Sequence, residues 1–179
     1  VKLIKAQGPL SIAGYMNEAL GNQKHGYYMK QDPFGRGGDF TTAPEISQMF
    51  GELIGLWHAG NWLNMGSPDE VHLIELGPGR GTLMQDALRS MKIVPNLLKS
   101  IKLHLVEMSP ALRQEQKKNL KGYIAPQWHN RLSQALEAAG GKPTLFIANE
   151  FFDALPIRQF QKAERGWHER LVSLDEGER

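Results

Sequence analysis

Apolar positions follow a helical period in the first third of this chain of 179 residues. Residues 12–20 carry them at i, i+3, i+4, i+7 and i+8, and Gly21 supplies a stop. A second helix is predicted from Thr42, where a capping box with a first-turn proline opens it, to about Leu63. In this helix Gly51 and Gly55 indicate close packing against a neighbour. The predicted apolar face consists of Ile46, Met49, Phe50, Leu53, Ile54 and Trp57.

After the Gly-Ser-Pro break at residues 66–68, predicted strands alternate with predicted helices. The strands are residues 71–76, 102–107, a weak one at 123–128, and 144–148. The helices between them are residues 83–91, 110–120 and 132–139, with a long loop at 94–100. Residues 158–174 are predicted to form a hairpin.

This alternation predicts an α/β fold with a parallel, doubly wound, Rossmann-like sheet and right-handed crossovers. We divide the chain into an N-terminal helical cap, residues 1–66, and a ligand-binding domain, residues 67–179. A complete sheet of this type needs about six or seven strands, and four strands with a hairpin are fewer. We therefore expect an incomplete sheet and a longer protein.

Composition excludes several classes of partner. The chain is 41% hydrophobic and 22% charged, with a net charge of +2. Its basic residues are scattered, which argues against nucleic acid, and no apolar run approaches the ~18 residues of a membrane span. Without cysteine there is no disulfide framework and no thiol nucleophile. The six histidines lack ligand spacing, so no metal site is expected.

The strongest chemical signal is the glycine-rich turn that follows the first predicted strand. Gly77, Gly79 and Gly81 alternate there, and a helix begins at about Thr82. Glycine permits positive φ and a close approach of ligand to backbone, and the helix presents free N–H groups. The pattern favours a nucleotide pocket at the carboxyl end of the strand, although a tight turn without a ligand would have the same composition.

The register of the glycines distinguishes between nucleotides. The dinucleotide fingerprint needs a small residue where Thr82 stands, and counting from Gly79 places Met84 there. Glu75, two residues before the first glycine, would repel a pyrophosphate but suits a ligand with an ammonium group. S-adenosylmethionine has an amine and a sulfonium and no phosphate, so the pattern favours it over NAD or FAD.

Two further groups of polar residues follow predicted strands. Glu107 ends the second strand, where a carboxylate can accept hydrogen bonds from a ribose diol or simply be solvated. Asn149, Glu150 and Asp153 follow the fourth strand and face the crevice of the glycine turn. Such carboxylates can bind a cationic nucleophile or accept its proton as it attacks a methyl group. Alternatively, Asp153 caps a turn and Glu150 pairs with a nearby cation.

Two other segments have both a functional and a structural interpretation. Gly38, Asp39, Thr41 and Thr42 precede the second helix and can form a loop that closes over a ligand, or an ordinary capped connection. Trp128 ends the weak third strand, where an adenine could lie beside it, although an aromatic residue in the core is the commoner case.

Several blocks together closely resemble the MidA-like family of class I S-adenosylmethionine-dependent methyltransferases. This family includes the mitochondrial complex I assembly-factor arginine methyltransferase. The blocks are residues 38–47, 75–83, 105–107 and 149–156. Members run well past the end of this chain, so the resemblance implies that a C-terminal half completes the sheet and adds substrate contacts.

The resemblance also implies roles for individual residues. Cofactor contacts would come from Glu75, Gly77, Gly79 and Gly81, with Glu107 on the ribose. Gly38, Asp39, Thr41 and Thr42 would cover the methionine end, and Asn149, Glu150 and Asp153 would lie beside the methyl group as catalytic residues.

The leading hypothesis is a methyltransferase acting on a protein, with an arginine nitrogen as acceptor and a complex I subunit as the implied partner. The compartment would be the cytoplasm in a bacterium and the mitochondrial matrix in a eukaryote. A binding scaffold for respiratory complex assembly is the alternative from a different class. A dinucleotide oxidoreductase is disfavoured by Thr82 and Glu75.

Overall fold

The computed structural model describes residues 1–22, 24–27, 42–175 and 177. The chain forms two compact units, one of Val1–Asp32 with Phe152–Arg179 and one of Pro33–Phe151. The predicted boundary after residue 66 differs from this division. Helix α5 (Gln48–Asn64) lies before that boundary, yet it packs on α6 (Thr82–Met91) within the second unit.

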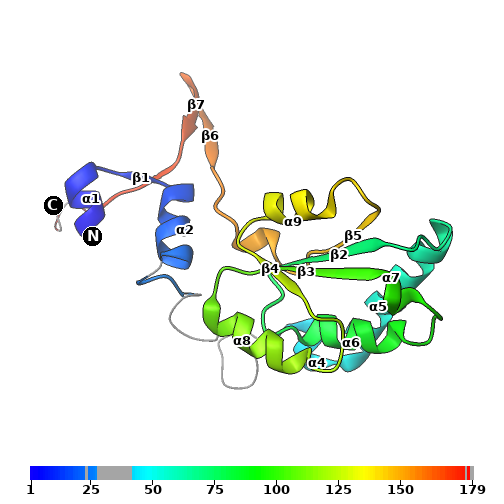
Figure 1. Cartoon of the computed structure of the whole chain (residues 1–179). Coiled ribbons are helices and arrows are strands. Elements are labelled where there is room, and N and C mark those ends of the chain that lie inside the picture. The colour runs from blue at the N-terminus through cyan, green and yellow to red at the C-terminus, as the bar shows by residue number, and fades with distance from the viewer. Residues whose placement is uncertain (23, 28–41, 176, 178–179) are drawn as a thin grey trace. The chain divides into compact units, whose positions relative to one another are not determined.

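The second unit contains a parallel four-stranded sheet in the order β4-β3-β2-β5 (Figure 1). The strands are β2 (Val71–Leu76), β3 (Ile101–Val106), β4 (Gln127–His129) and β5 (Thr144–Ile147). Besides α5 and α6, the unit contains α4 (Ala43–Ile46), α7 (Leu97–Ser100), α8 (Pro110–Asn119) and α9 (Leu132–Ala139). The predicted α/β fold is confirmed, and α7 occupies part of the expected long loop.

Helices cover both faces of this sheet, as Figure 1 shows. On one face α5 and α6 enclose the larger core, and on the other α9 packs over a smaller one. All six residues of β2 are buried, which is typical of a central parallel strand. The larger core includes Leu73, Met84, Leu88 and Leu103, each at most 2% exposed.

The second predicted helix differs from expectation in two ways. It is broken at Ser47 into α4 and α5, and Thr42 is the N-cap of α4 without a side-chain capping bond. The predicted capping box was therefore wrong, because the Glu45 carboxylate instead accepts a hydrogen bond from Thr82 Oγ1 at 2.7 Å.

The buried face of α5 is not the predicted one. Its buried residues are Gly51, Gly55, His58, Ala59 and Trp62. The predicted face is split, because Phe50 and Ile54 pack against the core while Ile46, Met49, Leu53 and Trp57 are exposed. Small residues allow α5 to approach α6 closely, and this approach selects the glycine-bearing side. The close packing predicted for the two glycines is confirmed.

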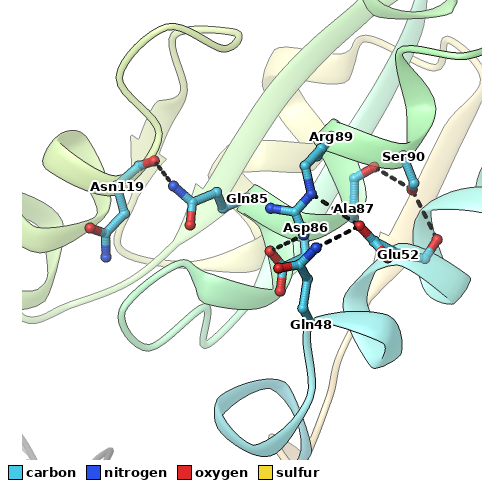
Figure 2. Close-up of polar contacts among 8 residues, drawn as sticks. All are labelled: Gln48, Glu52, Gln85, Asp86, Ala87, Arg89, Ser90 and Asn119. Carbon is cyan, nitrogen blue, oxygen red and sulfur yellow. Dashed lines mark hydrogen bonds and ion pairs between the residues drawn. The ribbon is translucent and has the colours of Figure 1, made fainter.

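Polar contacts secure the same helix pair (Figure 2). Arg89 on α6 reaches α5, with its Nε 3.0 Å from Glu52 Oε1, while its Nη2 lies 2.6 Å from Asp86 Oδ1 on α6 itself. Ser90 Oγ donates to the Glu52 carbonyl at 2.9 Å. Gln85 on α6 donates to the Asn119 carbonyl at 2.6 Å and so joins α6 to α8.

We expect Gly55→Ala to destabilise the protein by about 1–3 kcal/mol, the cost of overpacking a close contact. A Cβ at residue 55 would collide with Ser90 Oγ and with the carbonyl oxygen of Ala87. Gly60→Ala, on the same helix, is the matched control because a Cβ there meets nothing within 4 Å. It should stabilise by about 0.5–1 kcal/mol through helix propensity. Urea unfolding measures both, and equal effects would contradict the packing argument.

Three histidines form a hydrogen-bonded row across the α9 face of the sheet. His72 Nδ1 lies 2.7 Å from His104 Nε2, and His104 Nδ1 lies 2.9 Å from His129 Nε2. His72 is 5% exposed and His104 1% exposed. Burial, together with the neighbouring imidazoles, lowers the pKa of His104 to about 4, so this ring is neutral at pH 7.

The first unit joins sequence segments from the two ends of the chain. It contains α1 (Lys2–Gln7), β1 (Leu10–Ser11), α2 (Ile12–Gly21), the 3-10 turn η1 (Phe152–Ala154), β6 (Phe160–Ala163), β7 (Gly166–Glu169) and β8 (Leu171–Val172). The predicted hairpin is present as β6 and β7, but it ends at Glu169. Residues 171–172 instead pair antiparallel with β1. No helix among the described residues is long and apolar enough to cross a membrane.

Candidate functional site

The carboxyl ends of two neighbouring strands bring two of the predicted segments together. Strand β2 pairs in parallel with β5, and Glu75 lies opposite Ile147. The glycine turn at 77–81 follows β2, and residues 149–151 follow β5. The Phe151 ring packs so closely on Gly77 that a Cβ there would lie 2.6 Å from Phe151 Cδ2. The segment bearing Asn149 and Glu150 therefore lies beside the glycine turn.

The glycine turn has the conformation that its composition predicts. Gly77, Gly79 and Gly81 have φ values of +61°, +54° and +82°, in the left-handed region that only glycine adopts readily. Gly77 N–H donates to the Val106 carbonyl at 3.0 Å, and Gly81 N–H donates to the Pro78 carbonyl at 2.8 Å. Helix α6 starts directly afterwards, so its first N–H groups lie at the turn.

Glu75 is a buried carboxyl group near the carboxyl end of β2. Its side chain is 3% exposed, and Oε2 has no hydrogen-bond partner among the described residues. Burial raises the pKa of Glu75 to about 8 because the ionised form is desolvated. An unpaired buried carboxylate is costly, and a cationic donor would satisfy it. The position fits an ammonium group of a ligand held over the glycine turn.

Glu107 follows β3 and is held firmly at the same edge. Its N–H donates to the His129 carbonyl at 3.0 Å, and Oε1 accepts from Ser109 N–H at 2.8 Å. Arg113 donates to the Glu107 carbonyl through Nε at 2.9 Å. Burial raises the pKa of the Glu107 carboxyl, and the Ser109 N–H acts in the opposite direction. Its Oε2 retains acceptor capacity for hydroxyl groups of a ligand.

The three predicted catalytic residues are distributed over both units. Asn149 is half-buried and Glu150 is exposed, and both lie in the second unit. Glu150 has φ +48°, a strained conformation for a non-glycine residue that is often found at functional sites. Asp153 lies in η1, which belongs to the first unit.

The predicted covering loop lies only partly within the described residues. Gly38, Asp39 and Thr41 lie outside them, whereas Thr42 precedes α4 and is half-buried. The bond between Glu45 and Thr82 attaches α4 to the first residue of α6. Thr42 therefore lies one helical turn from a residue that contacts the start of α6.

Helix α8 contributes site residues that the sequence interpretation missed. Gln116 Nε2 donates to the Gly79 carbonyl at 2.7 Å, and Asn119 Nδ2 donates to the Arg80 carbonyl at 3.0 Å. A signal was available: Gln116 is four residues after the buried Leu112, so a polar residue stood on the apolar face of a predicted helix. Trp128 packs against the larger core, which favours its structural interpretation.

Comparison with known proteins identifies relatives of this chain. Residues 53–179 match the model of a family described as "Putative S-adenosyl-L-methionine-dependent methyltransferase". The chain is 43% identical to "Protein arginine methyltransferase NDUFAF7, mitochondrial" of Danio rerio and 38% identical to the protein of the same name of Homo sapiens. Each alignment covers 96% of this chain, and 45% and 43% of the relative.

A solved structure has the same architecture. The chain superimposes on a Burkholderia thailandensis protein crystallised with S-adenosyl-homocysteine, with a TM-score of 0.76 and 27% sequence identity. The superposition covers 98% of this chain and 45% of that protein. This chain thus spans somewhat less than half the length of the relatives it matches.

Proposed function

Since the chain belongs to the family of S-adenosyl-L-methionine-dependent methyltransferases, we propose that the protein transfers a methyl group from this cofactor to an arginine nitrogen of another protein. The observation that carries the proposal is the buried Glu75 carboxylate just before the glycine turn, whose Oε2 has no partner among the described residues, together with Phe151, which packs on Gly77. The relatives named as protein arginine methyltransferases support the choice of acceptor.

We assign the cofactor to four groups of this chain. Glu75 would pair with the ammonium group at the methionine end of the cofactor. The turn at Gly77, Gly79 and Gly81 would let the cofactor approach the backbone closely, because glycine has no Cβ. Glu107 would accept hydrogen bonds from the ribose through its carboxylate. We also propose that a loop covers the methionine end of the cofactor, formed by Gly38, Asp39, Thr41 and Thr42.

When bound, the cofactor would supply an electrophilic methyl group on a sulfonium sulfur. Transfer of the methyl group would leave that sulfur as a neutral thioether. The chain's task is to hold the acceptor nitrogen in line with that methyl and to accept the proton that the nitrogen loses. The exposure of Glu150, and its place in the chain next to Phe151, which packs on Gly77, support it as the proposed proton acceptor. Asn149 and Asp153 are proposed to assist in orienting the acceptor.

The partner and the compartment are more specific proposals. We propose a respiratory complex I subunit as the methylated protein, as the resemblance implies. The relatives named mitochondrial favour the mitochondrial matrix for a eukaryotic member, and the cytoplasm is proposed for a bacterial one.

Glu150→Gln should lower kcat by about 100-fold, because it removes the carboxylate that takes the proton. The Kd for S-adenosylhomocysteine, measured by isothermal titration, should stay within about threefold, since Glu150 lies outside the proposed cofactor contacts. Mass spectrometry of methylarginine in a knockout would identify the acceptor, and the purified full-length protein would then be assayed on it.

Glu137→Gln is the matched control, an exposed carboxylate near the end of α9 and outside the segments proposed for the site, and it should retain full activity. Failure of the full-length wild type to bind S-adenosylhomocysteine would refute the proposed function. Cofactor binding without methyl transfer to any acceptor would favour the assembly scaffold.

A further inference from the structure

Gln116 is a fully buried polar residue at the meeting point of three parts of the candidate cofactor site. It lies on α8 and is 0% exposed. Its side-chain amide contacts the Gly79 carbonyl, the Glu107 carboxylate and the Trp128 indole, at 2.7, 3.4 and 2.8 Å. These partners come from the glycine turn, the end of β3 and β4.

The chemistry of the partners fixes the orientation of the amide. The indole Nε1 of Trp128 can only donate, so the amide oxygen Oε1 must face it. The two N–H groups of Nε2 then face the Gly79 carbonyl and Glu107 Oε2, both of which can only accept. Each polar atom of the amide therefore has a complementary partner. A flipped amide would place an N–H against the indole N–H and lose all three contacts.

These contacts determine the orientation of the peptide groups in the glycine turn. The peptide bond after Gly79 is trans, so fixing its carbonyl also fixes the direction of the following N–H. The Gln116 side chain also fills the space beside Gly81, where a Cβ would meet Gln116 Cγ at 3.4 Å. The same amide restrains the Glu107 carboxylate, whose other oxygen is already held by Ser109.

We propose that Gln116 is a positioning residue for the adenosyl half of the cofactor, which orients Glu107 for the ribose diol and sets the peptide at Gly79. This inference rests on the proposed function. It assigns Gln116 to cofactor affinity and not to the methyl-transfer step, because its contacts reach the turn and Glu107 and none reaches Glu150.

Gln116→Met tests this, since methionine keeps the volume and the unbranched shape but makes none of the three hydrogen bonds. The Kd of the full-length protein for S-adenosylhomocysteine should rise about 10- to 100-fold, the effect of losing one or two hydrogen bonds between the cofactor and the misoriented Glu107 and turn. KM for S-adenosylmethionine should rise in parallel, while kcat at saturation stays within about threefold.

A ligand lacking the ribose 2′-hydroxyl separates positioning from a structural effect. In the wild type, 2′-deoxy-S-adenosylhomocysteine should bind more weakly than S-adenosylhomocysteine. In Gln116→Met that difference should shrink, because Glu107 is no longer oriented for the hydroxyl. A merely destabilising substitution would leave the ratio unchanged.

Gln85→Met is the matched control: it makes the same substitution and removes a hydrogen bond between α6 and α8, without touching Gly79 or Glu107. It should lower the melting temperature but leave Kd within about twofold. If Gln116→Met does not fold, Trp128→Phe frees the amide oxygen while retaining an aromatic ring, and it should weaken binding in the same ribose-dependent way.

The outcomes separate the two proposals. A wild type that does not bind S-adenosylhomocysteine refutes the proposed function. A wild type that binds, with unchanged affinity and unchanged ribose dependence in Gln116→Met and Trp128→Phe, refutes the role of Gln116 alone.

Discussion

Glu75→Gln should stabilise the free protein at high pH and at the same time weaken its binding of S-adenosylhomocysteine. The pKa of Glu75 is raised to about 8 by burial, and in the unfolded chain it is near 4.5. A raised pKa favours the folded state fully below pH 4.5, and that contribution is lost as the pH rises to about 8. Glutamine has nearly the same shape and stays neutral at every pH, so the variant keeps this contribution to stability at high pH.

The effect on stability is large because the shift spans several pH units. Each unit corresponds to 1.36 kcal/mol, so the unfolding free energies of the two proteins should differ by about 3–5 kcal/mol at pH 9. They should converge near pH 4, below the pKa of 4.5, where residue 75 is largely neutral in both the folded and the unfolded chain. Urea unfolding from pH 4 to 9 measures this difference, from which the contributions of groups such as His58 and His104 cancel.

The Glu75→Gln substitution, which should stabilise the folded protein, should weaken ligand binding. Without a carboxylate to pair with the ammonium, Kd for S-adenosylhomocysteine should rise about 10- to 100-fold. Near pH 7 the wild type should also release close to one proton on binding, because the ammonium converts Glu75 to its ionised form. Titration calorimetry in phosphate and in Tris measures the number of protons released, because the two buffers differ in their enthalpy of ionisation. Equal release by Glu75→Gln would place the titrating group elsewhere.

Gly79→Val should abolish detectable binding of S-adenosylhomocysteine, a loss of more than about 100-fold. Residue 79 has φ +54°, which a β-branched side chain adopts only with strain. The added side chain would occupy the turn over which the cofactor is proposed to lie, and the strain would displace the carbonyl that Gln116 holds. Isothermal titration of the folded variant is the measurement.

Gly140→Val distinguishes loss of the site from loss of the fold. Gly140 follows the last residue of α9 and has φ +56°, nearly the same φ as Gly79, and a Cβ there meets nothing within 4 Å. Both variants should lose about 1–3 kcal/mol of stability through backbone strain. Only Gly79→Val should lose binding, and retained affinity in that variant would move the cofactor away from the glycine turn.

Much of the sheet unit could be predicted because its signals are local. The strand and helix boundaries of β2, α6, β3 and α9 follow from runs of apolar residues and from their breaks. The glycine turn could be predicted because three alternating glycines between a strand and a helix favour a sharp turn at positive φ. Residues 149–151 could be placed beside it because parallel strands end at the same edge.

What could not be predicted depends on contacts between distant residues. The buried side of α5 is selected by how closely Gly51 and Gly55 approach α6, which outweighs the larger apolar side chains on the helix. The pairing of Leu10 with Val172 joins strands of two residues each, too short to give a periodic signal. Gln116 belongs to the site through the fold, since its partners lie 37, 9 and 12 residues away.

The row of His72, His104 and His129 has a consequence for strand alignment. In a sheet buried on both faces, a slip by two residues returns every side chain to its own face, so hydrophobicity penalises it weakly. The imidazoles lie diagonally across three strands, and a slip by two residues in the direction that moves them apart would leave buried ring nitrogens without partners. The row therefore disfavours slipped alignments of β2, β3 and β4, and so helps to set the relative heights at which Glu75 and Glu107 reach the edge of the sheet.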